Sequence, residues 1–284
     1  MLKNLTQFFR PRTAGEVCNL LSTKDKKFWV LAGGTTLGVS DDKSIEGLID
    51  LKGLNLSYVR KTPSGFAIGA TTPVQDIFKS TVLSGPAGEL LRKAAGSIGS
   101  TPLRNSITIG GNIVGMFPWT DLPPALMALD ASVVISDGKR EQSVPVSKLY
   151  ESTPRDILGN NQIVTEVLIP LYKGDTGVAF TKFAKTKNDY ALITVAVRIT
   201  RNGNSIREAR IALNAISRKP QRCLESERDL QDGPLSQNKL EKVAKGALKG
   251  LVVTSDIRAS KEYRTEILPV LVRRCLEEAV GQTS

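Results

Sequence analysis

Two short stretches of this chain combine adjacent glycines with hydroxyl or amide side chains, a composition suited to holding an anionic ligand. The first is LAGGTTL at Leu31–Leu37, where a short apolar run ends in Gly33 and Gly34 and two threonines follow. Glycine lets another molecule approach the main chain, and successive amide groups in such a turn converge on an anion. The threonine hydroxyls add donors, so this stretch could bind a phosphate. An ordinary tight turn is the alternative, because short motifs often match by chance.

The second stretch is TIGGN at Thr108–Asn112, and the acid Asp121 follows it in the sequence. Its hydroxyl, main-chain amide and side-chain amide groups are again possible donors. An ionised Asp121 only accepts hydrogen bonds, so it suits ribose hydroxyls or an amide N–H group rather than a phosphate. Neither stretch has the spacing of a Walker loop or of GxGxxG. Together the two stretches predict a pair of loops that close on one elongated polar ligand.

The composition removes most ways of doing chemistry without a cofactor. The 284-residue chain has no histidine, which excludes histidine-based acid–base catalysis, Ser/His/Asp triads and most zinc enzymes. Its three cysteines, Cys18, Cys223 and Cys275, lie far apart and form no CxxC pair, so we expect no disulfide framework, zinc site or iron–sulfur site in this chain. An enzyme with this sequence must rely on a cofactor, and we expect no catalytic side chain and no metal ligand of its own.

The chain carries a net charge of +11 and has an isoelectric point near 9.6, which fits nucleic acid, a membrane surface, an acidic partner or a phosphate-rich ligand. The basic residues are scattered, with KDKK at Lys24–Lys27 as the one tight cluster, and the sequence has no zinc finger and no RNP-like motif. We therefore expect a basic surface rather than a nucleic-acid interface. No apolar run is long enough to span a bilayer and the start lacks a secretory pattern, so a cytoplasmic protein is expected.

The two glycine stretches need rigid elements around them, and the spacing of apolar residues predicts three units. Residues 1–60 are expected to form a small β-α-β unit, and residues 61–172 a larger mixed α/β unit. Residues 173–284 are expected to form a lobe of three antiparallel strands followed by amphipathic helices, with Asn202-Gly203 as a hairpin turn. The predicted fold class is α+β, with a two-lobed ligand-binding part and a C-terminal lobe.

Local signals place several boundaries. Thr13 and Glu16 have the spacing of a capping box at the start of a helix over 12–22. A second helix is expected to start at Asp121, because the prolines that follow are tolerated in a first turn. The Asp137-Gly138 pair predicts the tight turn of a hairpin.

Five blocks of the sequence, in this order, resemble the flavin subunit of the molybdenum hydroxylases, which is the medium chain of the carbon monoxide dehydrogenase type and the counterpart of the middle domain of xanthine dehydrogenase. LAGGTTL resembles the AGG-T/S motif of that family. The most specific match is the signature R-N-x-x-T-I-G-G-N followed by D-L-P, in IGSTPLRNSITIGGNIVGMFPWTDLPPALMALDA. The other blocks are FFRPRTAGEVCNLL near the start, FTKFAKTKNDYALITVAV, and YRTEILPVLVRRCLEEA near the end. The resemblance covers nearly the whole chain.

The resemblance implies that FAD binds between the first two units, with the third lobe near the flavin ring. The first loop would hold the diphosphate, Asp121 matches the acid that contacts the cofactor, and Val164 matches an apolar position beside the flavin or adenine. Lys182 matches a lysine near the ring, where a cation would stabilise negative charge on reduced flavin; the alternative is a solvated strand lysine. The cofactor-binding residues implied in this way are Leu31, Ala32, Gly33, Gly34, Thr35, Thr36, Leu37, Thr108, Ile109, Gly110, Gly111, Asn112, Asp121, Val164 and Lys182.

The resemblance also implies an oxidoreductase that is one subunit of a complex. A large molybdenum–pterin subunit and a small subunit with 2Fe–2S clusters would be its partners, in a heterotrimer or a dimer of heterotrimers. This chain would take electrons from the 2Fe–2S subunit and pass them to NAD, a quinone or another acceptor. The alternatives are a stand-alone FAD-dependent oxidoreductase of related fold and a basic nucleic-acid-binding protein.

One segment departs from the pattern of the family. Met116, Phe117 and Trp119 are bulkier and more apolar than the residues that usually follow the GGN motif. Trp119 could stack on an aromatic ring or belong to the core. The chain also lacks the inserted cysteine-rich segment of the relatives that reduce benzoyl-CoA derivatives, which disfavours that subgroup.

Overall fold

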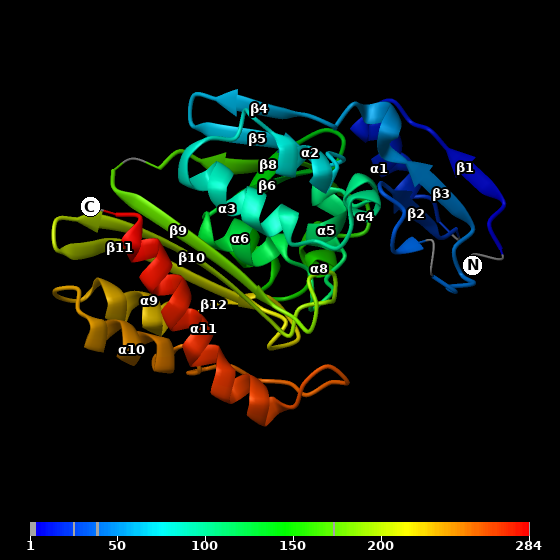
Figure 1. The fold of residues 1–284 in the computed structure, drawn as a ribbon. Coiled ribbons are helices and arrows are strands. Elements are labelled where there is room, and N and C mark those ends of the chain that lie inside the picture. The colour runs from blue at the N-terminus through cyan, green and yellow to red at the C-terminus, as the bar shows by residue number, and fades with distance from the viewer. Residues whose placement is uncertain (1–3, 25, 38–39, 173, 284) are drawn as a thin grey trace.

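The structure is a computed structural model of the 284-residue chain, and it describes residues 4–24, 26–37, 40–172 and 174–283. Its strands form three sheets, and helices pack against them (Figure 1). Over the described residues, no helix is both long and apolar enough to cross a bilayer. Over the same residues, no group of histidine, cysteine, aspartate and glutamate side chains is arranged to hold a metal ion.

The N-terminal part forms a small parallel sheet with the strand order β1-β3-β2. Parallel strands need a crossover, and helix α1 supplies one between β1 and β2. Thr13 caps α1 by accepting a hydrogen bond from the Glu16 amide at 3.2 Å, but the Glu16 carboxylate accepts from the Arg12 amide, so the predicted capping box is only half formed. The elements are β1 (Gln7–Phe9), α1 (Ala14–Leu21), β2 (Phe28–Leu31), β3 (Gly47–Asp50) and the 3-10 helix η2 (Leu51–Leu54).

The middle part is built on a five-stranded antiparallel sheet with the order β4-β5-β8-β6-β7. Helices α3 and α6 lie between this sheet and the C-terminal sheet, and the main hydrophobic core fills the space around them (Figure 1). The strands are β4 (Val59–Thr62), β5 (Gly65–Gly69), β6 (Ser132–Ser136), β7 (Glu141–Pro145) and β8 (Ile163–Pro170). The helices are α2 (Val74–Lys79), α3 (Gly85–Gly96), α4 (Thr101–Ser106), α5 (Ile109–Val114), α6 (Leu122–Ala128), α7 (Val146–Leu149) and α8 (Pro154–Leu158).

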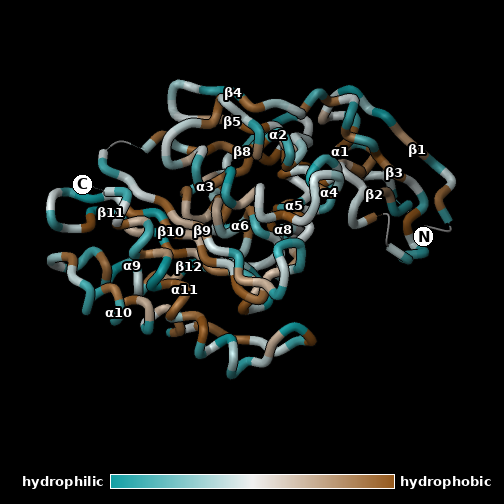
Figure 2. Tube along the Cα trace, in the orientation of Figure 1, coloured by the Kyte–Doolittle hydropathy of each residue, from teal (hydrophilic) through white to brown (hydrophobic). Residues whose placement is uncertain are grey.

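The C-terminal part is an antiparallel sheet with the order β12-β11-β10-β9, covered on its outer face by three helices (Figure 1). Strand β10 is buried on both faces, because Ala196 packs into the main core whereas Val195 and Val197 pack under the outer helices. Hydrophobic and hydrophilic segments alternate along α10 and α11, as expected of helices with one buried face (Figure 2). The elements are β9 (Thr176–Phe183), β10 (Ile193–Asn202), β11 (Ser205–Asn214), β12 (Gln221–Arg222), α9 (Leu224–Gln231), α10 (Gln237–Gly246) and α11 (Lys261–Gly281).

A partly buried ion cluster around the buried Arg198 joins the end of α6 to the C-terminal sheet. Asp130 receives ion pairs from Arg198 at 2.6 Å, Arg210 at 2.8 Å and Arg222 at 3.4 Å. Arg198 also donates to the carbonyl group of Ala128 at 2.9 Å. Because a buried guanidinium is costly without partners, these contacts fix α6 against β10 and β11.

The predicted α+β class is confirmed, and so are the hairpin turns at Asp137-Gly138 and Asn202-Gly203. Several elements had no prediction, among them β4, which carries charged rather than alternating residues, and α9, which is mostly polar. The C-terminal sheet has four strands rather than the three predicted, because the short strand β12 pairs with β11 at its edge. The second glycine stretch is rich in β-forming residues, yet it lies at the start of helix α5. Tertiary contacts and the Thr108 cap decide this conformation against the local propensity.

Candidate cofactor-binding site

The first glycine loop, residues 31–37, continues directly from strand β2. Leu31 and Leu37 belong to one small apolar cluster, so both ends of the loop are anchored. Gly34 has a φ of 73°, in the left-handed region that favours glycine. Within the described part of the chain, the amide groups of residues 33–36 donate no hydrogen bond, and Thr35 and Thr36 are exposed. The part of the loop that follows Ala32 therefore presents main-chain amide donors together with the hydroxyl donors of two threonines.

The two glycine loops touch each other. A Cβ atom added at Gly33 would lie 1.8 Å from the carbonyl oxygen of Ser106 and 3.4 Å from the amide nitrogen of Thr108. No side chain fits at such a distance from backbone atoms, so the contact requires glycine at this position. The sequence predicted two loops that close on one ligand, and their contact meets the first condition for such a site.

The main-chain amide groups of the second glycine loop donate hydrogen bonds within the chain. The first four residues of α5, Ile109–Asn112, each donate an amide hydrogen bond within the chain. The acceptors, in that order, are Thr72 O, Ala70 O, Thr108 Oγ1 and Thr108 O, at 3.0, 2.9, 3.2 and 2.9 Å. Contrary to the prediction, the amide groups of Gly110 and Gly111 are not free for a ligand, because the first bonds to the Ala70 carbonyl group and the second to the capping Thr108 hydroxyl.

Three other features of the second loop suit a polar ligand. A Cβ atom added at Gly111 would meet only the Thr108 hydroxyl, at 3.0 Å, so the main chain there is open to close approach. The side-chain oxygen of Asn112 is buried and has no hydrogen-bond partner among the described residues. The Thr108 hydroxyl accepts from Gly111 and retains its own proton to donate. With the donors of the first loop, this set fits a nucleotide cofactor that carries phosphates.

Asp121 and Lys182 form a buried ion pair at the junction of the middle part and the C-terminal sheet. Their side chains are 4% and 9% exposed, and the Lys182 ammonium lies 3.2 Å from the Asp121 carboxylate. Lys182 also donates to the carbonyl group of Ser97 at 2.9 Å, and Thr194 donates to Asp121 at 3.2 Å. Burial raises the pKa of Asp121 to about 6, although Lys182 and Thr194 favour its ionised form. Lys182 is therefore not a solvated strand lysine.

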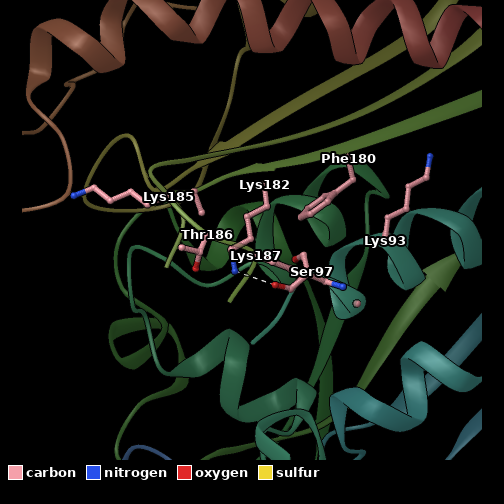
Figure 3. A pocket seen from close by; sticks show the side chains of 9 residues that line it. Lys93, Ser97, Phe180, Lys182, Lys185, Thr186 and Lys187 are labelled. Carbon is pink, nitrogen blue, oxygen red and sulfur yellow. Dashed lines mark hydrogen bonds between the residues drawn. The ribbon is translucent and has the colours of Figure 1, made fainter. Parts of the chain in front are cut away.

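A cavity of about 640 Å³ lies beside Lys182, between the C-terminal end of α3, strand β9 and the segment that follows β9 (Figure 3). The Lys182 ammonium points toward Ser97, whereas Lys93 extends away and pairs with two glutamates. Lys185 and Lys187 also line the cavity, and both are exposed. The cavity therefore has a positively charged rim.

The apolar residues implied as cofactor contacts are mainly part of the core. Val164 is buried in the main core and pairs with Ile135 across β6 and β8. The next residue, Thr165, accepts a hydrogen bond from the Ala70 amide, and Ala70 accepts from Gly110. Val164 thus lies close to the start of α5, where its contribution is to support the second glycine loop.

Sequence reasoning missed several residues that hold this region together. Thr194, Asn214 and the carbonyl group of Ser97 have no motif of their own, because their roles depend on strand register and on a helix end. Trp119 belongs to an aromatic cluster: it stacks on Phe117 with ring centroids 5.2 Å apart, and its centroid lies 4.9 Å from that of Tyr190. The spacing of Phe117 and Trp119 was the one available signal for this cluster.

Comparison with known proteins identifies two regions that match known families. Residues 4–172 match the family described as the FAD binding domain in molybdopterin dehydrogenase. Residues 178–279 match the family described as the CO dehydrogenase flavoprotein C-terminal domain. These two matches cover most of the chain and confirm the resemblance seen in its motifs.

The chain is also similar to named proteins over most of their length. It is 27% identical to the carbon monoxide dehydrogenase medium chain of Hydrogenophaga pseudoflava, over 96% of both chains. It is 29% identical to the glyceraldehyde dehydrogenase medium chain of Sulfolobus acidocaldarius, over 81% of this chain and 82% of that one. The crystal structure of the H. pseudoflava carbon monoxide dehydrogenase that lacks the Mo-pyranopterin moiety of its cofactor contains a chain that matches with a TM-score of 0.93 at 26% identity, over the full length of both. The chain therefore belongs to the family of FAD-binding subunits of the molybdenum hydroxylases, and it is the flavoprotein component of an oxidoreductase.

Proposed function

We propose that this chain binds one FAD between its two glycine loops and relays electrons from a small 2Fe–2S subunit to an acceptor such as NAD or a quinone. The single observation that carries the proposal is the contact between the loops, in which Gly33 lies against the backbone of residues 106–108. FAD, when bound, supplies the exchange of single electrons and electron pairs that such a junction needs. A large molybdenum–pterin subunit would complete the complex, and the proposal includes a cytoplasmic location.

The two loops would share the work of holding the cofactor. The amide groups of residues 33–36 and the Thr35 and Thr36 hydroxyls would bind the diphosphate, because they are donors without partners in the described chain. The open main chain at Gly111 would let the cofactor approach, and Thr108 and Asn112 would supply side-chain hydrogen bonds. Leu31, Ala32, Leu37, Ile109, Gly110 and Val164 would shape the walls.

Asp121 and Lys182 would set the charge next to the flavin ring. Lys182 is held by Asp121 and by the Ser97 carbonyl group, so two contacts restrain its ammonium. A fixed cation stabilises negative charge on a reduced flavin without reorganisation at the moment of electron transfer. This role needs no proton transfer by a side chain, in agreement with a chain that has no histidine.

The relatives support the assembly in the proposal. They are named as medium chains or subunits, among them the nicotine 6-hydroxylase medium subunit of Paenarthrobacter nicotinovorans. The net charge of +11 favours docking to an acidic partner. We also propose residues 1–60, 61–172 and 173–284 as the three units that meet at the cofactor, with a new lobe beginning after Tyr172.

The test is purification of the native complex, with its cofactors and subunits weighed by native mass spectrometry. We expect one FAD per copy of this chain, together with a small iron–sulfur chain and a large molybdenum chain. A flavin that is reduced by a small substrate without any partner would favour the stand-alone oxidoreductase. A colourless chain with salt-sensitive affinity for RNA would overturn the flavin proposal altogether.

The electron acceptor can be identified with the same complex. Flavin absorbance is followed after reduction by the substrate of the complex, with NAD or a quinone added in separate runs. Rapid reoxidation by one of the two identifies the acceptor. A flavin that stays oxidised while the iron–sulfur chain is reduced would contradict the proposed relay.

A further inference from the structure

Three side chains form a row across the C-terminal sheet where it meets the start of α6. Lys182 on β9 pairs in register with Thr194 on β10, and Thr194 pairs in register with Asn214 on β11. Residues at the same level on neighbouring strands present their side chains to the same face of a sheet. The row therefore faces a single short segment, which is the Thr120–Asp121 turn.

Each member of the row binds that turn. Lys182 and Thr194 bind the two carboxylate oxygens of Asp121, at 3.2 Å each, and the Asn214 side-chain amide donates to the carbonyl group of Thr120 at 2.7 Å. Thr194 and Asn214 are fully buried. These contacts fix both the position of Asp121 and the direction of the peptide group that precedes it.

A second set of contacts along the same strands shows what an ordinary anchor looks like. Arg198 lies four residues after Thr194 on β10. It binds the Ala128 carbonyl group and Asp130 at the other end of α6. That set holds the helix but reaches none of the residues implied as cofactor contacts. The Lys182–Thr194–Asn214 row, in contrast, reaches Asp121 directly.

We propose that Thr194 and Asn214 are positioning residues of the flavin site, which fix Asp121 beside Lys182 and so set the local charge that the bound flavin experiences. This inference rests on the proposed function, because it takes Asp121 and Lys182 as residues next to the flavin. The hydrogen bond from Thr194 stabilises the ionised form of Asp121. The hydrogen bond from Asn214 to the Thr120 carbonyl group fixes the position of Asp121.

The direction of the effect follows from the groups that face Asp121, which are Lys182 on β9, Thr194 on β10 and Ser97 at the end of α3. A hydrogen bond to a carboxylate favours its ionised form, so loss of the Thr194 hydroxyl raises the pKa of Asp121 above its present value of about 6. A larger fraction of Asp121 is then neutral near pH 7, and the charge of Lys182 is less compensated. A more positive surrounding favours reduced flavin, so the midpoint potential rises.

The experiment compares three variants of the FAD-loaded chain with the wild type. Thr194→Val removes the hydroxyl and keeps the shape, and Thr194→Ser restores a hydroxyl. Thr200→Val is the matched control, because Thr200 is a buried threonine of the same strand whose hydroxyl, among the described residues, bonds only to Thr176, at 3.0 Å. The measurements are the midpoint potential of the flavin from pH 5 to 8, the dissociation constant of FAD, and the unfolding temperature.

We expect Thr194→Val to raise the midpoint potential at pH 7, to move its pH-dependent region upward, and to weaken FAD binding roughly threefold to tenfold. Thr194→Ser is expected to resemble the wild type. Thr200→Val is expected to lower the unfolding temperature and leave the potential and the FAD affinity unchanged. If Thr194→Val moves only the unfolding temperature, as Thr200→Val does, or if Thr194→Ser fails to restore the potential, the proposal is wrong.

Two further measurements keep the test decisive. If the valine methyl group prevents folding, Thr194→Ala removes the same hydroxyl with less bulk and must give the same change in potential. If the wild-type chain binds no FAD, the proposed function fails and the positioning role is then measured in the unloaded chain. A raised folded-state pKa adds stability at low pH that is lost as the pH rises through about 6, so Thr194→Val must move this loss to higher pH. An unchanged profile would overturn the positioning role by itself.

Discussion

The two glycine pairs are similar in sequence, but their main-chain amide groups are engaged differently in the structure. At the first pair, the amide groups of residues 33–36 have no acceptor in the described chain, and the apolar ends of the loop pack in one small cluster. At the second pair, every amide from Ile109 to Asn112 is bonded within the chain, because Thr72 and Ala70 accept from the first two residues of α5 and Thr108 accepts from the next two. One loop therefore offers main-chain donors, and the other offers a rigid surface with an open glycine and two polar side chains.

The comparison shows that a glycine pair indicates a place where another group lies close to the main chain. The group that lies there differs from one glycine to the next. Position 33 requires glycine because the backbone of Ser106 lies against it. Position 110 requires glycine because a Cβ atom added there would lie 2.8 Å from the carbonyl oxygen of Ala70. Gly111 has no such backbone neighbour. In the proposed site a ligand approaches the main chain at Gly111, and substitutions can separate these cases.

The largest effect is expected for Gly33→Ala. The new Cβ atom would lie 1.8 Å from the Ser106 carbonyl oxygen, so the two loops must separate. We expect a loss of about 3 kcal/mol or more in the free energy of unfolding, and no detectable FAD binding. Denaturant unfolding and FAD titration measure both. Gly281→Ala, at a helix end where no described atom lies within 4 Å of the added atom, is the control and should change neither. Wild-type FAD binding by Gly33→Ala would disprove the contact between the loops.

The second effect tests the ligand explanation for Gly111. Gly111→Val should abolish FAD binding and leave the fold intact, because the larger side chain occupies space that only the Thr108 hydroxyl borders. Gly246→Val is a matched control: it is also a helical glycine whose added Cβ atom would meet a single hydroxyl, that of Ser226 at 3.3 Å. Visible absorbance of the purified variants and circular dichroism separate the two results. A yellow, fully loaded Gly111→Val would refute the placement of the cofactor.

The third effect isolates backbone strain in the first loop. Gly34 and Gly250 both have a φ of 73°, a conformation that costs other residues about 1–2 kcal/mol. Gly34→Ala and Gly250→Ala should therefore lose similar stability, measured as unfolding temperature. Only Gly34→Ala should also weaken FAD binding, by about tenfold, because its amide group would turn away from the diphosphate. Equal FAD affinity in the two variants would mean that the first loop does not hold the cofactor.

The comparison also shows what a single sequence can and cannot reveal. The α+β class, the helix at Asp121 and the hairpin turns were predictable, because they follow from apolar spacing and from local turn residues. The pairing of Lys182, Thr194 and Asn214 was not, because it depends on the exact register of three consecutive strands, which shifts between Thr200 and Arg201. The different fates of the two glycine pairs were hidden for a similar reason: β-forming residues around Gly110 become helical only through contacts with Ala70 and Thr72.

A smaller effect concerns the threonine that caps α5. Thr108→Val should cost about 1 kcal/mol of stability through loss of the cap and should weaken FAD binding a few-fold. Thr13→Val is the matched control, because Thr13 accepts an equivalent hydrogen bond, also at 3.2 Å, at the start of α1. The control should lose the same stability with no change in FAD affinity. If the FAD affinities of the two variants agree, Thr108 is a cap and nothing more.

The smallest effect is expected where the first loop contributes only a side chain. Thr36 is exposed and its hydroxyl makes no hydrogen bond among the described residues, so Thr36→Val should leave the unfolding temperature unchanged. If its hydroxyl binds the diphosphate, FAD affinity should fall about threefold, the loss of one solvent-exposed hydrogen bond. Together with Thr108→Val, this variant completes the comparison of the loops: in one the hydroxyl serves the ligand alone, and in the other it serves both helix and ligand. Titration of FAD by fluorescence quenching decides this, and a loss of stability in Thr36→Val without a loss of affinity would reverse the roles of the two loops.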